Sequence, residues 1–214
     1  MQIKLHAKAK RILCAVLTVL LVLGATLSHY LWDPWGFYWK VSDAETQLRT
    51  QYVATAQQYL GYNEADGSHQ KIVDQYNAHE PLAVGYVVQY TDSWCATFVS
   101  AVAIQCGLTD IIPTECGCER QIGLFQNISR WEENDAAIPL PGDLIYYDWD
   151  IKEMGDCTGW TDHVGIVVGT KWPFVKVIEG NKDDMVSYRY ILLNDPQIRG
   201  YAKPDFASHS AKMP

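Results

Sequence analysis

The chain is short of basic residues, since 17 lysines and arginines stand against 25 acidic residues and the formal net charge is −8. Four of the basic residues precede Ile12 and no acidic residue precedes Asp33, so the rest of the chain is more acidic still. Nucleic-acid binding requires clusters of Lys and Arg that face phosphate, and this balance excludes a nucleic-acid partner. Internal repeats, low-complexity segments and a phosphate-binding glycine loop are also missing, which excludes repeat proteins and P-loop nucleotide-binding proteins.

The composition that remains is that of a globular protein. The 214 residues are 48% hydrophobic and 12% aromatic, which is enough apolar surface to offset the entropy of ordering a core. This length suits one compact domain with a short appendage and is too small for two full domains.

The appendage is the amino terminus, where no charge interrupts the run from Ile12 to Leu27. Extended to Leu31, the run reaches 20 residues, about the length of a transmembrane helix. A basic cluster precedes it and an aromatic segment follows, so we expect a single-pass membrane anchor over residues 1–32 with its amino end in the cytoplasm. A cleaved signal peptide that releases a secreted protein is the alternative, although no clean A-x-A cleavage pattern is present. Both interpretations place the body of the protein outside the cytoplasm.

The six cysteines suggest a partly oxidised protein. Cys14 lies in the predicted anchor, which leaves an odd number of five in the body. If Cys95 is a free thiol, disulfides could form among the other four, although unpaired cysteines remain an equal alternative. A zinc site is less well supported, because C-x-C without a second close ligand pair does not match structural zinc spacing. The four cysteines that could pair are Cys106, Cys116, Cys118 and Cys157.

The order of predicted elements indicates an α+β fold. Apolar spacing predicts helices over Asp43–Leu60 and His69–Tyr76, a buried helix from about Trp94 that ends at Gly107, and a helical stretch around Glu119–Trp131. Asp92 or Ser93 is expected to cap the buried helix. Helices first and consecutive strands later are typical of an antiparallel sheet packed against helices. The expected strands are Leu144–Asp148, His163–Val168, Phe174–Asn181, Val186–Leu192 and Ile198–Ala202, and the tail from Pro204 is expected to fray.

Cys95 and His163 are the residues most suited to catalysis. Cys95 falls in the first turn of the predicted buried helix, where the helix dipole favours a thiolate. His163 opens a strand, and a catalytic histidine needs a partner that orients its ring. Glu179 and Asn181 lie two residues apart on the next strand and therefore share one sheet face, where either could orient His163. Each of these residues also has an ordinary structural interpretation, and it is their combination that favours catalysis.

Four blocks in this order resemble the CHAP family of cysteine peptidases and amidohydrolases: YTDSWCATFVSAV, PGDLIYYDW, TDHVGIVVG and VIEGN. The resemblance covers about residues 44–202. It implies a papain-like fold of the NlpC/P60 type, with the catalytic cysteine at a helix start packed on the antiparallel sheet. It also implies hydrolysis of an amide bond in peptidoglycan through an acyl-enzyme, by an amidase or an endopeptidase.

Carried over by position, the resemblance makes Cys95 the nucleophile, His163 the general base, Glu179 the orienting residue and Asn181 an additional polar position. Trp94, beside the nucleophile, could line a substrate groove or pack in the core. The domain organisation expected is an anchor over residues 1–32, a linker over 33–43, a hydrolase domain over 44–203 and a tail over 204–214.

Neither a cofactor nor a metal is expected. Some CHAP domains bind calcium through an acidic loop, but three acidic residues near His163 in the sequence lack EF-hand spacing: Asp148, Asp150 and Asp156. Two alternative functions remain open. An NlpC/P60-type endopeptidase shares the layout but usually has a second histidine as the orienting residue. A catalytically silent, membrane-anchored module that binds wall peptide would use the same groove without needing the complete catalytic set.

Overall fold

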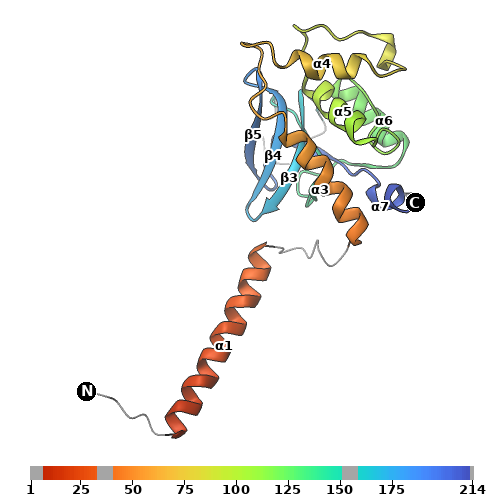
Figure 1. Ribbon diagram of the computed structural model, residues 1–214. Coiled ribbons are helices and arrows are strands. Elements are labelled where there is room, and N and C mark those ends of the chain that lie inside the picture. The colour runs from red at the N-terminus through yellow and green to blue at the C-terminus, as the bar shows by residue number, and fades with distance from the viewer. Residues whose placement is uncertain (1–6, 33–40, 151–158, 213–214) are drawn as a thin grey trace.

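The computed structural model describes residues 7–32, 41–150 and 159–212 (Figure 1). Most of the predicted linker over residues 33–43 lies outside the described residues, and so do Asp156 and Cys157.

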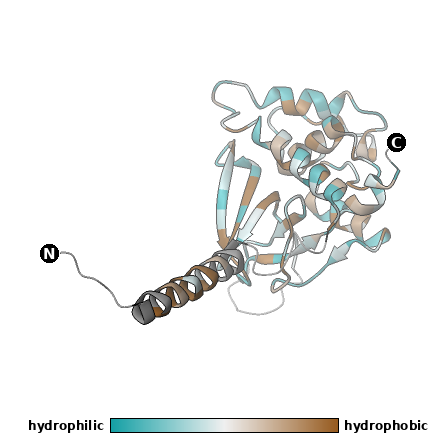
Figure 2. Ribbon diagram, turned by 60° about the horizontal axis from the view of Figure 1, so that its bottom comes forward, coloured by the Kyte–Doolittle hydropathy of each residue, from teal (hydrophilic) through white to brown (hydrophobic). Residues whose placement is uncertain are grey.

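The first helix, α1 (Ala7–Trp32), covers the apolar run of the amino terminus, and Figure 2 shows its predominantly hydrophobic character. The prediction of a transmembrane helix is wrong: among the described residues, no helix is long and apolar enough to cross a membrane.

Four helices form one layer of the body, and all four were predicted. A serine cap starts the first of them, because Ser42 Oγ accepts a hydrogen bond from the Glu45 N–H at 3.1 Å. The third ends where predicted, at Gly107, whose φ of 68° is a left-handed conformation that favours glycine. The helices are α3 (Asp43–Gln57), α4 (Gln70–Asn77), α5 (Cys95–Cys106) and α6 (Cys118–Asn127), and a 3₁₀ helix, η1 (Ala83–Gly85), lies between α4 and α5.

The second layer is a six-stranded antiparallel sheet, which confirms the predicted fold class as far as α+β with an antiparallel sheet. The papain-like assignment stays a prediction. Five strands were expected, and the sixth is a two-residue edge strand too short to produce a sequence pattern. In spatial order the strands are β1 (Trp131–Glu132), β6 (Ile198–Ala202), β2 (Leu144–Tyr147), β3 (His163–Lys171), β4 (Phe174–Lys182) and β5 (Met185–Leu192).

Helix α5 lies at the centre of the core. It contacts α3 and α4 on one side and β3 and β4 on the other, in agreement with the layers of Figure 1. Residues 95–103 of α5 are all buried, as a helix that is apolar nearly all round requires. Two strands of the sheet are thereby held against the amino-terminal end of α5.

The carboxyl-terminal tail does not fray as expected. Residues 206–210 form α7 (Phe206–Ser210), which contacts α3, and Phe206 is fully buried beside Tyr52. The guanidinium of Arg49 lies 4.5 Å from the centre of the Phe206 ring. Ion pairs of Asp205 with Arg130 and of His209 with Asp110 also hold this segment, so the packed body extends beyond the predicted boundary at residue 203.

Candidate active site

Cys95 is the first residue of α5 and is only 5% exposed. The predicted side-chain cap is absent: Trp94 occupies the N-cap position without a capping hydrogen bond. Asp92 instead accepts hydrogen bonds from the Gln89 N–H and the Tyr86 hydroxyl. No side chain therefore competes with the thiol for the N–H groups of the first turn, and the Ala96 N–H donates a hydrogen bond to the Cys95 sulfur.

His163 is the first residue of β3, where it pairs with Tyr147 of β2. Its Nε2 lies 3.2 Å from Oε2 of Glu179, which confirms that the two residues meet. His163 and Cys95 also lie close enough to shift each other's pKa, and Nδ1 is the ring nitrogen of His163 that Glu179 does not contact. The structure thus brings together three of the predicted catalytic residues, which come from α5, β3 and β4.

Arg189 of β5 is a fourth member of this group that the sequence analysis missed. Its Nε donates to both carboxylate oxygens of Glu179, at 2.7 and 2.9 Å, and Glu179 itself is completely buried. The buried carboxylate therefore faces two cationic partners, His163 and Arg189. No short-range pattern could identify Arg189, because the contact depends on how β4 and β5 pair.

An aromatic wall stands beside the histidine, and it too was missed. The rings of Tyr147 and Trp149 are stacked at 4.7 Å, and the ring of His163 lies 6.0 and 5.9 Å from them. The guanidinium of Arg189 lies 4.8 Å from the Trp149 ring. The sequence did hold a signal for this pair. Tyr147 ends β2 and Trp149 follows two residues later, so both rings would be expected on the same face of the sheet.

The electrostatics of the site favour a thiolate and an imidazolium. A hydrogen bond from Cys118 lowers the pKa of Cys95, and His163 lowers it further, so that the pKa falls well below its usual value despite burial. Burial alone would lower the pKa of His163, but hydrogen bonds to Cys95 and Glu179 outweigh burial and raise that pKa to about 9. Burial would raise the pKa of Glu179, but His163 and Arg189 hold it below its usual value. These are the charge states that a nucleophilic cysteine and its acid partner require.

Two glycines permit the close approach of the elements that carry these groups. A Cβ on Gly180 would lie 2.4 Å from the Phe98 Cβ, so only glycine lets β4 pack this closely on α5. A Cβ on Gly165 would lie 2.7 Å from the Glu179 Cγ, so glycine on β3 leaves room for the carboxylate beside His163. The glycines of HVG and EGN therefore contribute directly to the geometry of the site.

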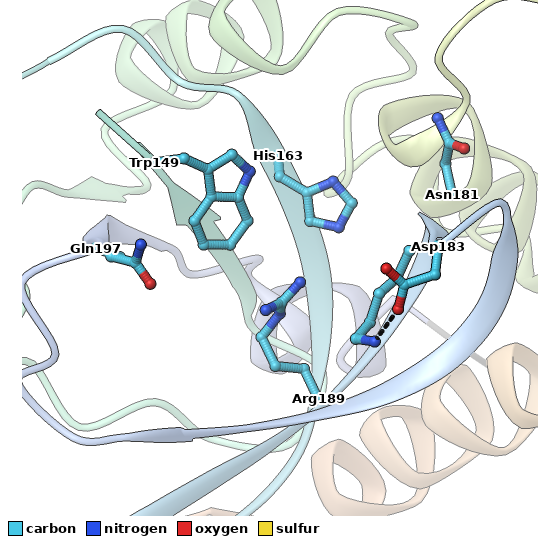
Figure 3. Close-up of a pocket in the computed structure, with 7 residues that line it drawn as sticks. Trp149, His163, Asn181, Asp183, Arg189 and Gln197 are labelled. Carbon is cyan, nitrogen blue, oxygen red and sulfur yellow. Dashed lines mark hydrogen bonds and ion pairs between the residues drawn. The ribbon is translucent and has the colours of Figure 1, made fainter. Parts of the chain in front are cut away.

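A pocket of about 350 Å³ opens next to His163 (Figure 3). Asn181 contributes to its lining, but it does not share the role of Glu179. The strand pairing is irregular between Glu179 and Lys182, Asn181 has a φ of 56°, and Figure 3 shows its amide turned away from the His163 ring. The bulge breaks the alternation from which a shared face was predicted. The pocket is lined by Trp149, His163, Asn181, Lys182, Asp183, Arg189 and Gln197.

The structure places Trp94 in the core, with no exposed surface for a substrate. It is fully buried, donates from Nε1 to Glu64 at 2.9 Å, and packs 5.8 Å from the ring of His69. The core interpretation of Trp94 is thus the one that the structure supports.

Among the described residues, the remaining cysteines of the body are unpaired, which was one of the two alternatives left open. Cys106, Cys116 and Cys118 are free thiols, and Cys157 lies outside the described residues. Cys118 instead contacts the candidate nucleophile, with 3.4 Å between its Sγ and that of Cys95. The spacing of cysteines in the sequence could not predict this contact, because it depends on how the first turns of α5 and α6 pack together.

Within residues 7–32, 41–150 and 159–212, no group of three or more His, Cys, Asp or Glu side chains is arranged to hold a metal ion. Asp156, one of the acidic residues considered for calcium, lies outside these ranges.

Comparisons with known proteins leave the family open. No protein-family model matches the chain. No curated protein matches it either. Among solved structures, the chain is similar to "The crystal structure of Ly7917", with 15% sequence identity and a TM-score of 0.33. The match covers 51% of this chain and 53% of that chain, about half the length of each, and a likeness at this TM-score carries no argument about fold or function.

Proposed function

We propose that this protein is a cysteine hydrolase that cleaves an amide bond in peptidoglycan. The observation that carries the proposal is the arrangement of Cys95, His163 and Glu179. The thiol stands at a helix start and its pKa is lowered by a nearby imidazole, whose Nε2 lies 3.2 Å from a buried carboxylate. This is the arrangement of nucleophile, base and orienting residue that acyl transfer requires.

In the proposed reaction, the Cys95 thiolate attacks the carbonyl carbon of the scissile amide. The N–H groups of the uncapped first turn of α5 are positioned to stabilise the negative charge that develops on the carbonyl oxygen. The His163 imidazolium then gives its proton to the leaving amine, and a thioester with Cys95 remains. Water, deprotonated by neutral His163, hydrolyses the thioester and regenerates the thiol.

Glu179 has two roles in this scheme. Its carboxylate fixes the orientation of the His163 ring and stabilises the imidazolium, while Arg189 fixes Glu179 through both carboxylate oxygens. Trp149, whose ring is stacked on that of the buried Tyr147, lines the pocket next to His163 and would contact the substrate there.

The substrate class comes from the four sequence blocks that resemble CHAP enzymes. Peptidoglycan lies outside the cytoplasmic membrane, so the proposal places the domain there. Both an N-acetylmuramoyl-L-alanine amidase and an endopeptidase fit the site, because each attacks an amide carbonyl. Glu179 stands where NlpC/P60 enzymes usually have a second histidine, and this favours a CHAP-type enzyme over an NlpC/P60-type one.

The test is release of soluble fragments from purified bacterial sacculi by the full-length protein. Wild type should release fragments, Cys95→Ala should not, and Cys106→Ala, at the opposite end of the same helix, should behave as wild type. Mass spectrometry of the fragments distinguishes the two bond types, because the new amino terminus identifies the bond that was cut. If wild type and Cys95→Ala are equally inactive on several types of sacculus while both sediment with them, the protein is a binding module and the proposal fails.

A further inference from the structure

The contact between Cys95 and Cys118 joins the amino-terminal ends of two helices. Cys95 is the first residue of α5 and Cys118 the first residue of α6, and their sulfur atoms are 3.4 Å apart. A disulfide has a sulfur–sulfur distance of about 2 Å, so the two atoms need to approach by only about 1.4 Å. Cys106 lies at the other end of α5, about 16 Å along the helix axis, and cannot compete for Cys95.

A buried polar network holds Cys118 in this position. The Ser100 hydroxyl on α5 donates to the Glu115 carbonyl at 2.8 Å and accepts from the Glu115 N–H at 2.9 Å. Gln121 of α6 donates to the Pro113 carbonyl and accepts from the Tyr146 hydroxyl of β2, both at 2.9 Å. The segment that leads into α6 is thus fixed to α5 and to the sheet. The proximity of the two thiols is therefore a property of the packed core.

The two thiols have different acidities. The pKa of Cys95 is lowered by Cys118 and His163, whereas the hydrogen bond to Cys95 and burial raise the pKa of Cys118. Cys95 is consequently the thiolate that an oxidant attacks first, and Cys118 is the neutral thiol that can resolve the product. Both residues are more than 90% buried, which favours a small oxidant such as a peroxide over a protein oxidant.

We propose that Cys95 and Cys118 are a reversible modification site, at which a peroxide converts the dithiol to a disulfide and removes the nucleophile. The Cys95 thiolate attacks one peroxide oxygen, the O–O bond breaks, and the departing hydroxide takes the His163 proton to leave as water. The Cys118 thiol then attacks the resulting sulfenic sulfur, the S–O bond breaks, and a second water leaves with the Cys118 proton. Two thiols are oxidised by two electrons and one peroxide is reduced to two waters. A dithiol reductant reverses the change.

The consequence for catalysis rests on the proposed function, but formation of the disulfide does not. The full-length protein, in a Cys106→Ser/Cys116→Ser background, is treated with hydrogen peroxide, and the remaining thiols are then alkylated under denaturing conditions. Cleavage before Asp92 and Asp110 places Cys95 and Cys118 on different peptides. We expect these two peptides to be joined after oxidation and separated by dithiothreitol.

Activity on sacculi supplies the second measurement, with each protein compared with its own untreated sample. Oxidised wild type should lose at least tenfold in activity and recover it with dithiothreitol. Cys118→Ser should lose activity without recovery, because Cys95 proceeds to sulfinic acid when no thiol resolves it. Cys116→Ser, a change only two residues away, should recover as wild type does.

The proposal is overturned if no joined peptide containing Cys95 and Cys118 forms, or if Cys118→Ser recovers as fully as wild type. The joined peptide is measured on a protein that retains both cysteines, so it does not depend on the folding of Cys118→Ser. If the disulfide forms but the reduced protein never releases fragments, the modification site stands and the proposed hydrolase function fails.

Discussion

Replacing Glu179 with glutamine removes one buried negative charge and almost nothing else. The carboxylate is fully buried and receives hydrogen bonds from His163 and Arg189. Glutamine has nearly the same shape but cannot stabilise an imidazolium by charge. Because Glu179 is one of the two groups that raise the pKa of His163 to about 9, Glu179→Gln should lower that pKa.

The size of the expected fall in the pKa of His163 follows from the pKa of His163 in wild type. The rise in the pKa of His163 from 6.5 to about 9 corresponds to about 3 kcal/mol in favour of the imidazolium. An equal share for Glu179 is about 1.5 kcal/mol, or roughly tenfold in the protonation equilibrium, which places the pKa of the variant near 8. Burial opposes the rise, so Cys95 and Glu179 together supply more than this difference.

In the proposed mechanism, the sign of the pH dependence is set by the proton that His163 gives to the leaving amine. Activity should be present below the pKa of His163 and should be lost as the pH rises through it. In wild type the loss should be centred near pH 9, and in Glu179→Gln near pH 8 or below. The measurements are the pH profile of kcat/KM and an NMR titration of the ¹⁵N-labelled His163 ring.

The matched control is Asp143→Asn. Asp143 is also a buried carboxylate that accepts from an arginine, with 2.8 Å between its Oδ1 and Arg49 Nη1, but it forms no contact with His163. Asp143→Asn should destabilise the protein and leave the titration of His163 unchanged. If His163 titrates in Glu179→Gln as it does in wild type, the carboxylate does not hold the imidazolium and the assigned role of Glu179 is refuted.

Three further substitutions test the supports of the site. Arg189→Met leaves Glu179 buried with one partner fewer. It should therefore reduce kcat/KM at least tenfold and destabilise the fold by about 3 kcal/mol in urea denaturation. An unchanged kcat/KM would mean that Arg189 does not position Glu179. Gly180→Ala should push β4 away from Phe98, lower the free energy of unfolding by about 1–3 kcal/mol and reduce activity. The control is Gly169→Ala, whose Cβ meets nothing within 4 Å and which should lower the free energy of unfolding by less than about 1 kcal/mol. Arg49→Met should destabilise the fold by about 3–5 kcal/mol, because it leaves Glu45 and Asp143 without their cationic partner. The pH profile of activity should not change, since these two acids are remote from the catalytic residues. A shifted profile would contradict that separation.

The parts of the fold that the sequence could predict are those with a local cause. Apolar spacing located α5 because a helix surrounded by core shows little polar interruption, and Gly107 marked its end through the left-handed conformation it adopts. The pairing of His163 with Glu179 was predictable because neighbouring strands in an antiparallel sheet place alternate residues side by side.

The errors come from features that are not local. Asn181 was assigned to the face of Glu179 by strict alternation, which a strand irregularity interrupts. The tail was expected to fray because its composition is polar, but it is fixed by the burial of Phe206 and by ion pairs of Asp205 with Arg130 and of His209 with Asp110. Arg189 and Cys118 were missed because each meets its partner only through the assembled core, across residues distant in sequence.

The nucleophilic reactivity of Cys95 and its sensitivity to oxidation have the same physical origin. The helix start and the imidazolium that would make Cys95 nucleophilic at neutral pH also make it the thiol that a peroxide oxidises first. A hydrolase that works without a reducing partner would lose activity permanently through sulfinic acid. A second thiol 3.4 Å from the nucleophile changes that outcome, because it captures the sulfenic acid as a disulfide before further oxidation. In the proposed hydrolase, the buried hydrogen bonds of Ser100 and Gln121 would therefore serve catalysis indirectly. They hold α6 where Cys118 lowers the pKa of Cys95 and would protect its sulfur.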